Sequence, residues 1–288
     1  MANTLQLPVI GNWEGHIVRL VNGMSIEVDK RDLVGDHIAY WGAWEKDAVA
    51  FVRHYLKPGM VVIDAGTHVG QYSMISSRCV GPSGQVHGFE PHPGLFNVFQ
   101  RNIKRSDCRN VVSQQLALGK RAEERLLYPS AVNNLGATSF VPAGPECGNP
   151  LSVTVIRLDD YVAEHAIEGV DFIKVDVEGA ELELLEGAEK TLNENYNIVL
   201  MIEFYALNAT RFGYTIQVLE HKLRRAGFHL FSINGHGLAP YQDRPELCQN
   251  VVAVRKLSIL LKNLPEAYAA QSLLGLALKK QDHPASND

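Results

Sequence analysis

The stretch VVIDAGTHVGQYSMISS, from Val61 to Ser77, changes character at its centre. An apolar run leads into Asp64, two glycines at positions 66 and 70 bracket a short loop, and a segment compatible with a helix follows at once. Backbone N–H groups at a helix N-terminus favour an anionic group, and glycine lets a ligand approach the backbone closely. The order strand, loop and helix therefore predicts a ligand-binding turn here.

The same alternation of strand and helix continues along the chain. Polar turns separate apolar runs from segments whose apolar residues recur at helical spacing, which is typical of a doubly wound α/β fold. We predict a mostly parallel, seven-stranded sheet with an antiparallel last strand, because only a loop joins the final two strands. The predicted strands are 60–63, 85–89, 111–118, 171–176, 198–204, 228–233 and 250–254, and the predicted helices between them are 70–80, 93–105, 179–193 and 214–226.

Two further segments flank this principal domain, which we place at residues 46–255. Residues 1–45 form an N-terminal extension in which HIVRL and MSIEV surround an Asn22-Gly23 turn, the signature of a β-hairpin. Residues 256–288 are predicted to be a helical tail, interrupted at Pro265. Its apolar face is able to pack on the core or on a second copy of the chain, so a homodimer is one expectation.

The amino-acid composition limits the binding partners and the cellular compartment that we expect. The 288 residues carry a formal net charge of −5, which gives no reason to expect nucleic acid or an anionic membrane as a partner. The four cysteines show no metal-ligand or C-x-x-C spacing, and the N-terminus lacks a signal sequence. We therefore expect reduced thiols and a cytoplasmic location.

Three acidic residues should meet at one edge of the predicted sheet. Asp64, Glu90 and Asp176 each follow a different strand, and the carboxyl ends of parallel strands lie at the same edge. An acidic residue after the second strand is placed to accept hydrogen bonds from ribose hydroxyls. His68 stands where a G-x-G-x-x-G loop has its middle glycine, which disfavours a diphosphate. The loop instead suits a nucleoside with a partly cationic tail, such as S-adenosylmethionine.

A wider set of motifs carries a family resemblance. The segments VVIDAGTHVGQYS, GFEPHP, VIRLDDY, DFIKVDVEGAELELLEGA and VLMIEF, in that order and spacing, resemble the FkbM-type family of class I, S-adenosylmethionine-dependent methyltransferases. The likeness covers roughly residues 40–255, and K-V-D-V-E-G-A-E is its most specific part. The family loop usually reads D-x-G-A-N-x-G, and Thr67 and His68 depart from it here. The resemblance implies a Rossmann-like sheet and a methyltransferase domain at 46–255.

The resemblance also implies roles for individual residues. Those expected to line the methionine end of the cofactor are Asp64, Gly66, His68, Gly70 and Gln71, with Tyr72 close by. Glu90 would hold the ribose, Pro91 and His92 would flank the adenine, and Gln115 to Ala117 would approach the base. Asp176 and Glu178 would lie between cofactor and acceptor.

The predicted reaction is methylation of a hydroxyl on a small molecule or glycan, and the resemblance alone implies the preference for oxygen. A base helps to remove the hydroxyl proton. The side chains of suitable type are Asp176, Glu178, Glu203, His68 and His92; we favour Asp176 and Glu178 because the edge of the fourth strand faces the methyl group in this architecture. Asp176 and Glu203 are also potential metal ligands, but without a third ligand we predict no metal. The alternatives are a nicotinamide-dependent oxidoreductase and a non-catalytic cofactor-binding module.

Overall fold

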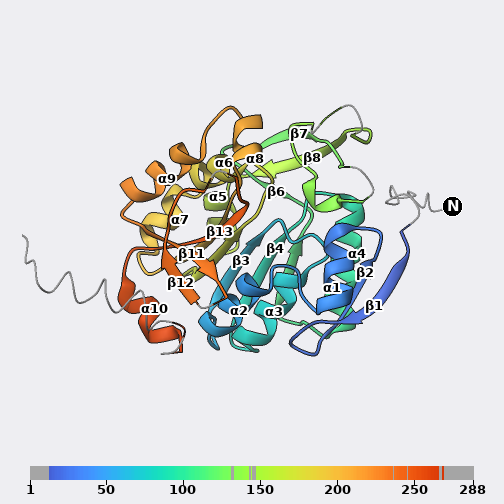
Figure 1. The fold of residues 1–288 in the computed structure, drawn as a ribbon, viewed down its shortest axis with the longest axis horizontal. Helices are drawn as coiled ribbons and strands as arrows, with labels where there is room; N and C mark the ends of the chain where they lie inside the picture. Colours follow the sequence, from blue (N-terminus) through green and yellow to red (C-terminus); the bar gives the residue numbers. More distant parts are fainter. Residues whose placement is uncertain are drawn as a thin grey trace, which may run out of the picture.

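A large twisted sheet forms the centre of the molecule (Figure 1). The structure is a computed structural model that describes residues 13–130, 133–142, 144, 147–235, 237–244, 246–265 and 268. The strands of this sheet are β3 (Val61–Ala65), β4 (Gln85–Phe89), β5 (Val111–Gln114), β9 (Phe172–Val175), β10 (Val199–Phe204), β11 (His229–Asn234), β12 (Gly237–Pro240) and β13 (Gln249–Val254).

The strand order confirms the doubly wound, mostly parallel arrangement. In space the order is β12-β11-β13-β10-β9-β3-β4-β5. The five adjacent strands β10, β9, β3, β4 and β5 run parallel. Strand β13 lies antiparallel between β10 and β11. The sheet has eight strands in the described residues and not seven, because the chain after β11 turns back and pairs as β12. Pro240, which has no N–H group to donate, ends this edge strand.

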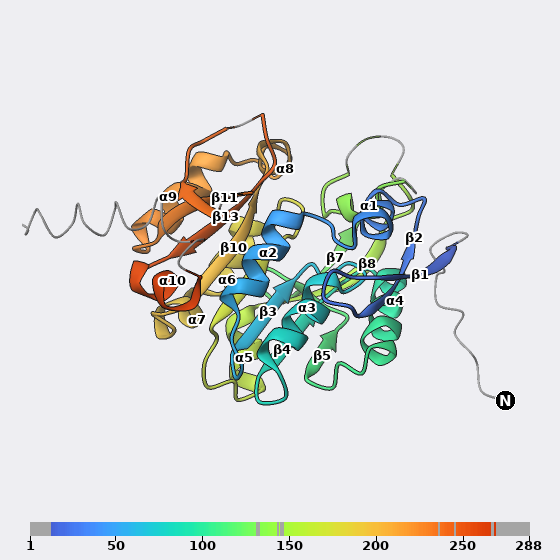
Figure 2. The same ribbon diagram turned by 60° about the horizontal axis from the view of Figure 1, so that its bottom comes forward.

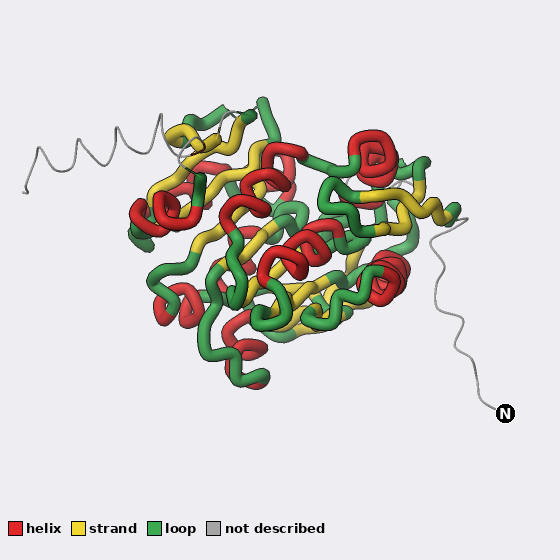
Figure 3. The backbone as a smooth tube through the Cα atoms, turned by 90° about the horizontal axis from the view of Figure 1, so that it is seen from below, coloured by secondary structure: helices red, strands yellow, loops and turns green. Residues whose placement is uncertain are grey.

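Helices cover both faces of the sheet (Figures 2 and 3). Alternate residues of the inner strands, such as Phe172 and Ile173 of β9, belong to two separate apolar clusters, as expected for a sheet buried on both sides. One face carries α2 (Lys46–Tyr55), α3 (Gln71–Val80), α4 (Pro93–Arg105) and α10 (Leu257–Asn263). The other carries α5 (Leu158–Glu164), α6 (Glu181–Gly187), α7 (Glu189–Glu194) and α9 (Ile216–Arg225).

The predicted N-terminal hairpin is present as β1 (Gly15–Arg19) and β2 (Ser25–Asp29). It packs on α4, where the buried amide of Asn102 bonds both the N–H group and the carbonyl of Glu27. A helix that the sequence analysis did not predict, α1 (Leu33–Trp41), follows the hairpin. It begins at the capping carboxylate of Asp32 and ends at Gly42, whose φ of 73° is left-handed.

A second small sheet lies above the carboxyl ends of the central strands (Figure 1). Its strands are β6 (Ala117–Leu118), β7 (Glu123–Leu127) and β8 (Leu151–Ile156). The predicted strand 111–118 is therefore wrong in its second half, because the chain leaves the large sheet after Gln114 and pairs with β8 instead. The predicted irregular insertion at 130–150 contains, in its described part, the short 3₁₀ helix η1 (Leu135–Ala137).

The first part of the C-terminal tail packs on the core. Leu260 of α10 is fully buried in the cluster that includes α2 and β13. Most of the predicted tail beyond Pro265 lies outside the described residues, so the predicted homodimer and the division at 45 and 255 stay predictions. Within the described ranges, no helix combines the length and apolar character needed to cross a membrane.

Candidate functional site

The loop between β3 and α3 has an unusual backbone. Gly66, His68 and Gly70 all adopt left-handed conformations, with φ values of 83°, 52° and 95°. A Cβ atom on Gly66 would overlap the carbonyl oxygen of Asp176, and one on Gly70 would overlap the ring of Phe99. These two positions therefore require glycine on both conformational and steric grounds. The resulting turn presents backbone N–H groups at the start of α3.

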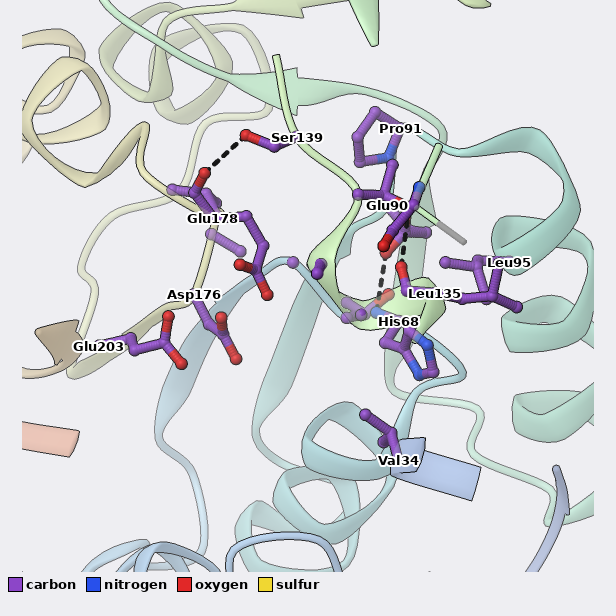
Figure 4. A pocket seen from close by; sticks show the side chains of 18 of the residues that line it. Val34, His68, Glu90, Pro91, Leu95, Leu135, Ser139, Asp176, Glu178 and Glu203 are labelled. Carbon is purple, nitrogen blue, oxygen red and sulfur yellow. Dashed lines mark hydrogen bonds between the residues drawn. The ribbon is translucent and has the colours of Figure 1, made fainter. Parts of the chain in front are cut away.

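Asp64 and Glu90 lie on either side of this loop and are both buried. Asp64 Oδ2 accepts a hydrogen bond of 2.6 Å from Ser73 Oγ, and burial raises the pKa of Asp64 to about 6 although Lys174 opposes the shift. Glu90 accepts hydrogen bonds from the backbone N–H groups of His68 (2.8 Å) and His92 (2.9 Å). Burial nevertheless raises the pKa of Glu90 to about 8. Glu90 thus fixes the loop and still presents its carboxyl group to the cavity (Figure 4).

Three more carboxylates converge at the ends of β9 and β10 (Figure 4). Oxygens of Asp176, Glu178 and Glu203 lie within 4.8 Å of one another. Burial, followed by the charge of Asp176, raises the pKa of both Glu178 and Glu203 well above the usual value for glutamate. Glu178 supplies the third oxygen that the sequence did not clearly offer. Each of the three carboxylates has a protein hydrogen-bond donor, and the prediction of no metal stays a prediction.

Those donors come from side chains that the sequence analysis did not assign to the site. Lys174 Nζ lies 2.7 Å from Asp176 Oδ2, Asn208 Nδ2 donates to Glu178 Oε2 at 2.7 Å, and Cys248 Sγ lies 3.0 Å from Glu203 Oε1. Lys174 is only 2% exposed. Burial alone would lower the pKa of Lys174, but Asp176 and Asp64 outweigh it and raise that pKa. The sequence does contain a signal for Lys174, because it is a charged residue inside the otherwise apolar core of the run DFIKVD.

A wall of the site comes from α1 and η1, which are distant in sequence. Asp32, 1% exposed, accepts hydrogen bonds from the backbone N–H groups of Leu135 (2.7 Å) and Gly35 (3.0 Å). Its Oδ2 atom also lies 3.8 Å from Nε2 of His68. One buried carboxylate therefore joins the N-terminal extension, the insertion and the glycine loop.

The polar groups of Gln71 and Tyr72 bond to the segment GAWE at residues 42–45, which precedes α2. The Gln71 amide accepts from the backbone N–H group of Trp44 (2.7 Å) and donates to its carbonyl (3.2 Å), while the Tyr72 hydroxyl donates to Glu45 (2.9 Å). Both residues line the cavity, but these contacts show them holding its wall in place.

One cavity of about 520 Å³ brings most of the predicted residues together. The predicted residues on its wall are Gly66, His68, Gln71, Tyr72, Glu90, Pro91, Ala117, Asp176 and Glu178. Asp64, Gly70 and His92 do not line it. Asp64 lies behind the loop, Gly70 faces Phe99, and Nδ1 of His92 caps α4 by accepting from the N–H groups of Gly94 and Leu95. Burial lowers the pKa of His92 to about 4, and its occupied Nδ1 makes it a poor candidate base.

Several buried polar atoms at the loop lack a hydrogen-bond partner among the described residues. They are Oδ1 of Asp64, Oγ1 of Thr67 and both ring nitrogens of His68. Unsatisfied buried polar groups cost free energy unless a ligand or water completes them. Those of Thr67 and His68 lie on the cavity wall and, together with the glycine turn and Glu90, form a polar cradle that suits a nucleoside with a charged amino-acid tail.

The sequence of this chain matches a known protein family. The profile of the methyltransferase FkbM domain matches residues 64–230. The 31-O-demethyl-FK506 methyltransferase FkbM of Streptomyces tacrolimicus is 28% identical over 167 residues, which cover 48% of this chain and 64% of that protein. The hexuronic acid methyltransferase AglP of Haloferax volcanii is 25% identical over 203 residues, 70% of this chain and 76% of its own length. The chain thus spans just under two thirds of the FkbM relative.

The chain is also similar to a solved structure over part of its length. The crystal structure of methyltransferase FkbM from Methylobacillus flagellatus aligns with 68% of this chain and 43% of its own, at 16% sequence identity and a TM-score of 0.45.

Proposed function

The chain belongs to the methyltransferase FkbM family, and we propose that it transfers a methyl group from S-adenosylmethionine to a hydroxyl of a small molecule or glycan. The observation that carries the proposal is the single cavity that joins the glycine turn and Glu90 to the carboxylates of Asp176 and Glu178. The names of two relatives, a 31-O-demethyl-FK506 methyltransferase and a hexuronic acid methyltransferase, support an oxygen acceptor on an oxygen-rich molecule.

The residues at the turn fit the cofactor. When bound, S-adenosylmethionine supplies a methyl group on a sulfonium that departs as a neutral thioether. Glu90 accepts hydrogen bonds from the ribose hydroxyls, as acidic residues in this position do. The unpartnered atoms of Thr67 and His68, which line the cavity, serve the polar amino-acid tail. Asp176, anchored by Lys174, provides negative charge that favours a cationic ligand.

Glu178 is the residue that we propose as the base. Its raised pKa lets it take a proton from an acceptor hydroxyl more readily than an ordinary glutamate does. Asn208 holds one of its oxygens, which fixes the direction of the carboxylate. Asp176, whose Oδ2 is bonded to Lys174, orients the cationic side of the cofactor. Glu203 lies beside both and completes the negative end of the cavity.

A direct test measures binding and transfer separately. Calorimetry should show that the wild-type protein binds S-adenosylhomocysteine and does not bind NADH. Incubation with isotope-labelled S-adenosylmethionine and a lysate of the source organism, followed by mass spectrometry, should identify a labelled acceptor. Glu178→Gln should retain cofactor affinity and lose about 10²-fold or more in transfer rate.

The same test separates the alternatives. Binding of NADH in preference to S-adenosylhomocysteine would sink the proposal in favour of the oxidoreductase. Cofactor binding without transfer to any acceptor would favour the non-catalytic module. The cytoplasmic location and the absence of nucleic acid and membrane partners stay predictions from composition, and the homodimer stays a prediction from the apolar face of the C-terminal tail.

A further inference from the structure

An arginine lies on the cavity wall, joined through one side chain to the acidic cluster. Arg211 is the last residue of α8 (Ala206–Arg211), which follows β10, and it lines the same cavity as the insertion residues Ser139 and Phe140. Its side chain is half-buried. The one hydrogen bond that it makes within the described chain is a long one, 3.4 Å from Nη1 to Oδ1 of Asn208.

The other basic side chains of the wall have acidic neighbours. Lys174 is paired with Asp176, and His68 lies beside Asp32. No carboxylate in the described part of the chain lies within ion-pair distance of Arg211, whereas the nearby Arg125 pairs with Glu183. An arginine in the last turn of a helix also complements the helix dipole. That role does not require the side chain to lie on a cavity wall.

A guanidinium that faces a cavity without a counter-ion is complementary to an oxyanion. Its planar array of N–H donors matches a carboxylate or a phosphate in two parallel hydrogen bonds. Within the neighbouring acidic cluster, the ammonium of Lys174 already offsets the charge of Asp176.

The position of Asn208 links this arginine to the reacting end. Its Oδ1 atom accepts from Arg211, and its Nδ2 atom donates to Glu178. A single side chain therefore separates the guanidinium from the carboxylate that we propose as the base. An acceptor that uses both groups must carry its anion close to its reacting hydroxyl, within one sugar-sized unit.

We infer that the methyl acceptor is an acidic sugar or polyol whose carboxylate or phosphate binds Arg211 while a neighbouring hydroxyl faces Glu178. This inference rests on the proposed function and narrows its acceptor to anionic molecules. Arg211 is then a specificity-determining residue: it selects the acceptor and does not contribute to cofactor affinity.

The test uses sugars of matched shape on the full-length protein saturated with S-adenosylhomocysteine. Methyl β-D-glucuronoside, D-glucose 6-phosphate and the neutral methyl β-D-glucoside are titrated by calorimetry or saturation-transfer NMR. At least one anionic sugar should bind tenfold or more tightly than the neutral one, and the preferred anion identifies carboxylate or phosphate. Arg211→Gln should weaken that binding about ten- to hundredfold. The exposed Arg225→Gln on α9 is the matched control and should change nothing.

The outcomes are separable. Equal affinity for anionic and neutral sugars, no binding of either anionic sugar, or an Arg211→Gln variant that binds as the wild type does would overturn the inference. Each of these results leaves the proposed function standing if S-adenosylhomocysteine still binds. Failure of the wild-type protein to bind S-adenosylhomocysteine would overturn the proposed function and the inference with it.

Discussion

The carbonyl oxygen of Asp176 occupies the space into which a side chain on Gly66 would project. The turn after β3 and the end of β9 are thus in backbone contact, and Asp176 N donates to the carbonyl of Ala65 at 3.1 Å. The glycine at position 66 therefore sets the distance between the cofactor turn and the acidic cluster.

Gly66→Ala should destabilise the protein and abolish cofactor binding. Gly66 has a φ of 83° and is blocked by backbone, which cannot yield as a side chain does. Gly23 is a matched control, because its φ is 84° and a Cβ atom there would have no neighbour within 4 Å. Gly23→Ala should cost only the left-handed backbone penalty of about 1–2 kcal/mol in the free energy of unfolding. Equal losses in urea denaturation would contradict the steric explanation.

Glu90→Ala should weaken binding of S-adenosylhomocysteine about 100-fold or more. The variant removes a charged acceptor for ribose hydroxyls, and each such hydrogen bond contributes about 1.5–3 kcal/mol. It also leaves the N–H groups of His68 and His92 without their acceptor. Glu168→Ala, an exposed glutamate after α5, serves as the control for calorimetry. An unchanged dissociation constant for Glu90→Ala would remove the main support for the cofactor assignment.

Cofactor affinity should rise with pH between about 6.5 and 8.5. The pKa of Glu90 is about 8 in the free protein, so the carboxyl group is mostly protonated at neutral pH. Ribose hydroxyls donate to the ionised form, so binding favours ionisation and releases a proton. Higher pH therefore favours the complex until Glu90 is fully ionised.

Calorimetry in two buffers of different ionisation enthalpy checks this proton release at pH 7. Glu90→Gln, which cannot ionise, should bind weakly with a flat pH profile over the same range. Proton uptake by the wild-type protein, or an affinity that falls across this range, would show that Glu90 does not hold the ribose as a carboxylate.

Asp32→Ala should lower the free energy of unfolding by about 2–4 kcal/mol and weaken cofactor binding. The substitution leaves the buried N–H groups of Leu135 and Gly35 without an acceptor. The wall formed by α1 and η1 then loses its attachment to the glycine loop. Asp36→Ala, an exposed position on the same helix, should have a small effect. Similar denaturation midpoints for the two variants would argue against this role of Asp32.

Local patterns made the central part of the site predictable. The apolar run before Asp64, the spaced glycines and the acidic residue after each strand are short-range signals, and parallel strands bring their ends together without further information. The structure confirms the mostly parallel sheet and places Glu90 and Asp176 of the predicted trio on the wall of one cavity, together with Glu178, whereas Asp64 does not line it.

The wall of the site could not be predicted in the same way. Leu33 N donates to the carbonyl of Asn133 at 2.9 Å, and such a backbone bond between distant segments leaves no trace in residue type. Strand β6 departs from the expected 111–118 strand because its partner, β8, comes much later in the chain. Cys248 and Asn208 reach the acidic cluster through tertiary packing alone, which periodicity does not encode.

Lys174 has a consequence for how the chain folds. It pairs in register with Asp64 of β3 and Met201 of β10, and its ammonium meets Asp176 on one face of the sheet. A slip of β9 by one residue would turn Lys174 to the opposite, apolar face and bury its charge there without a partner, which costs free energy. The buried lysine therefore penalises a misaligned β9. A chain whose central strands are in register has, for the same reason, also assembled the acidic cluster of the cavity.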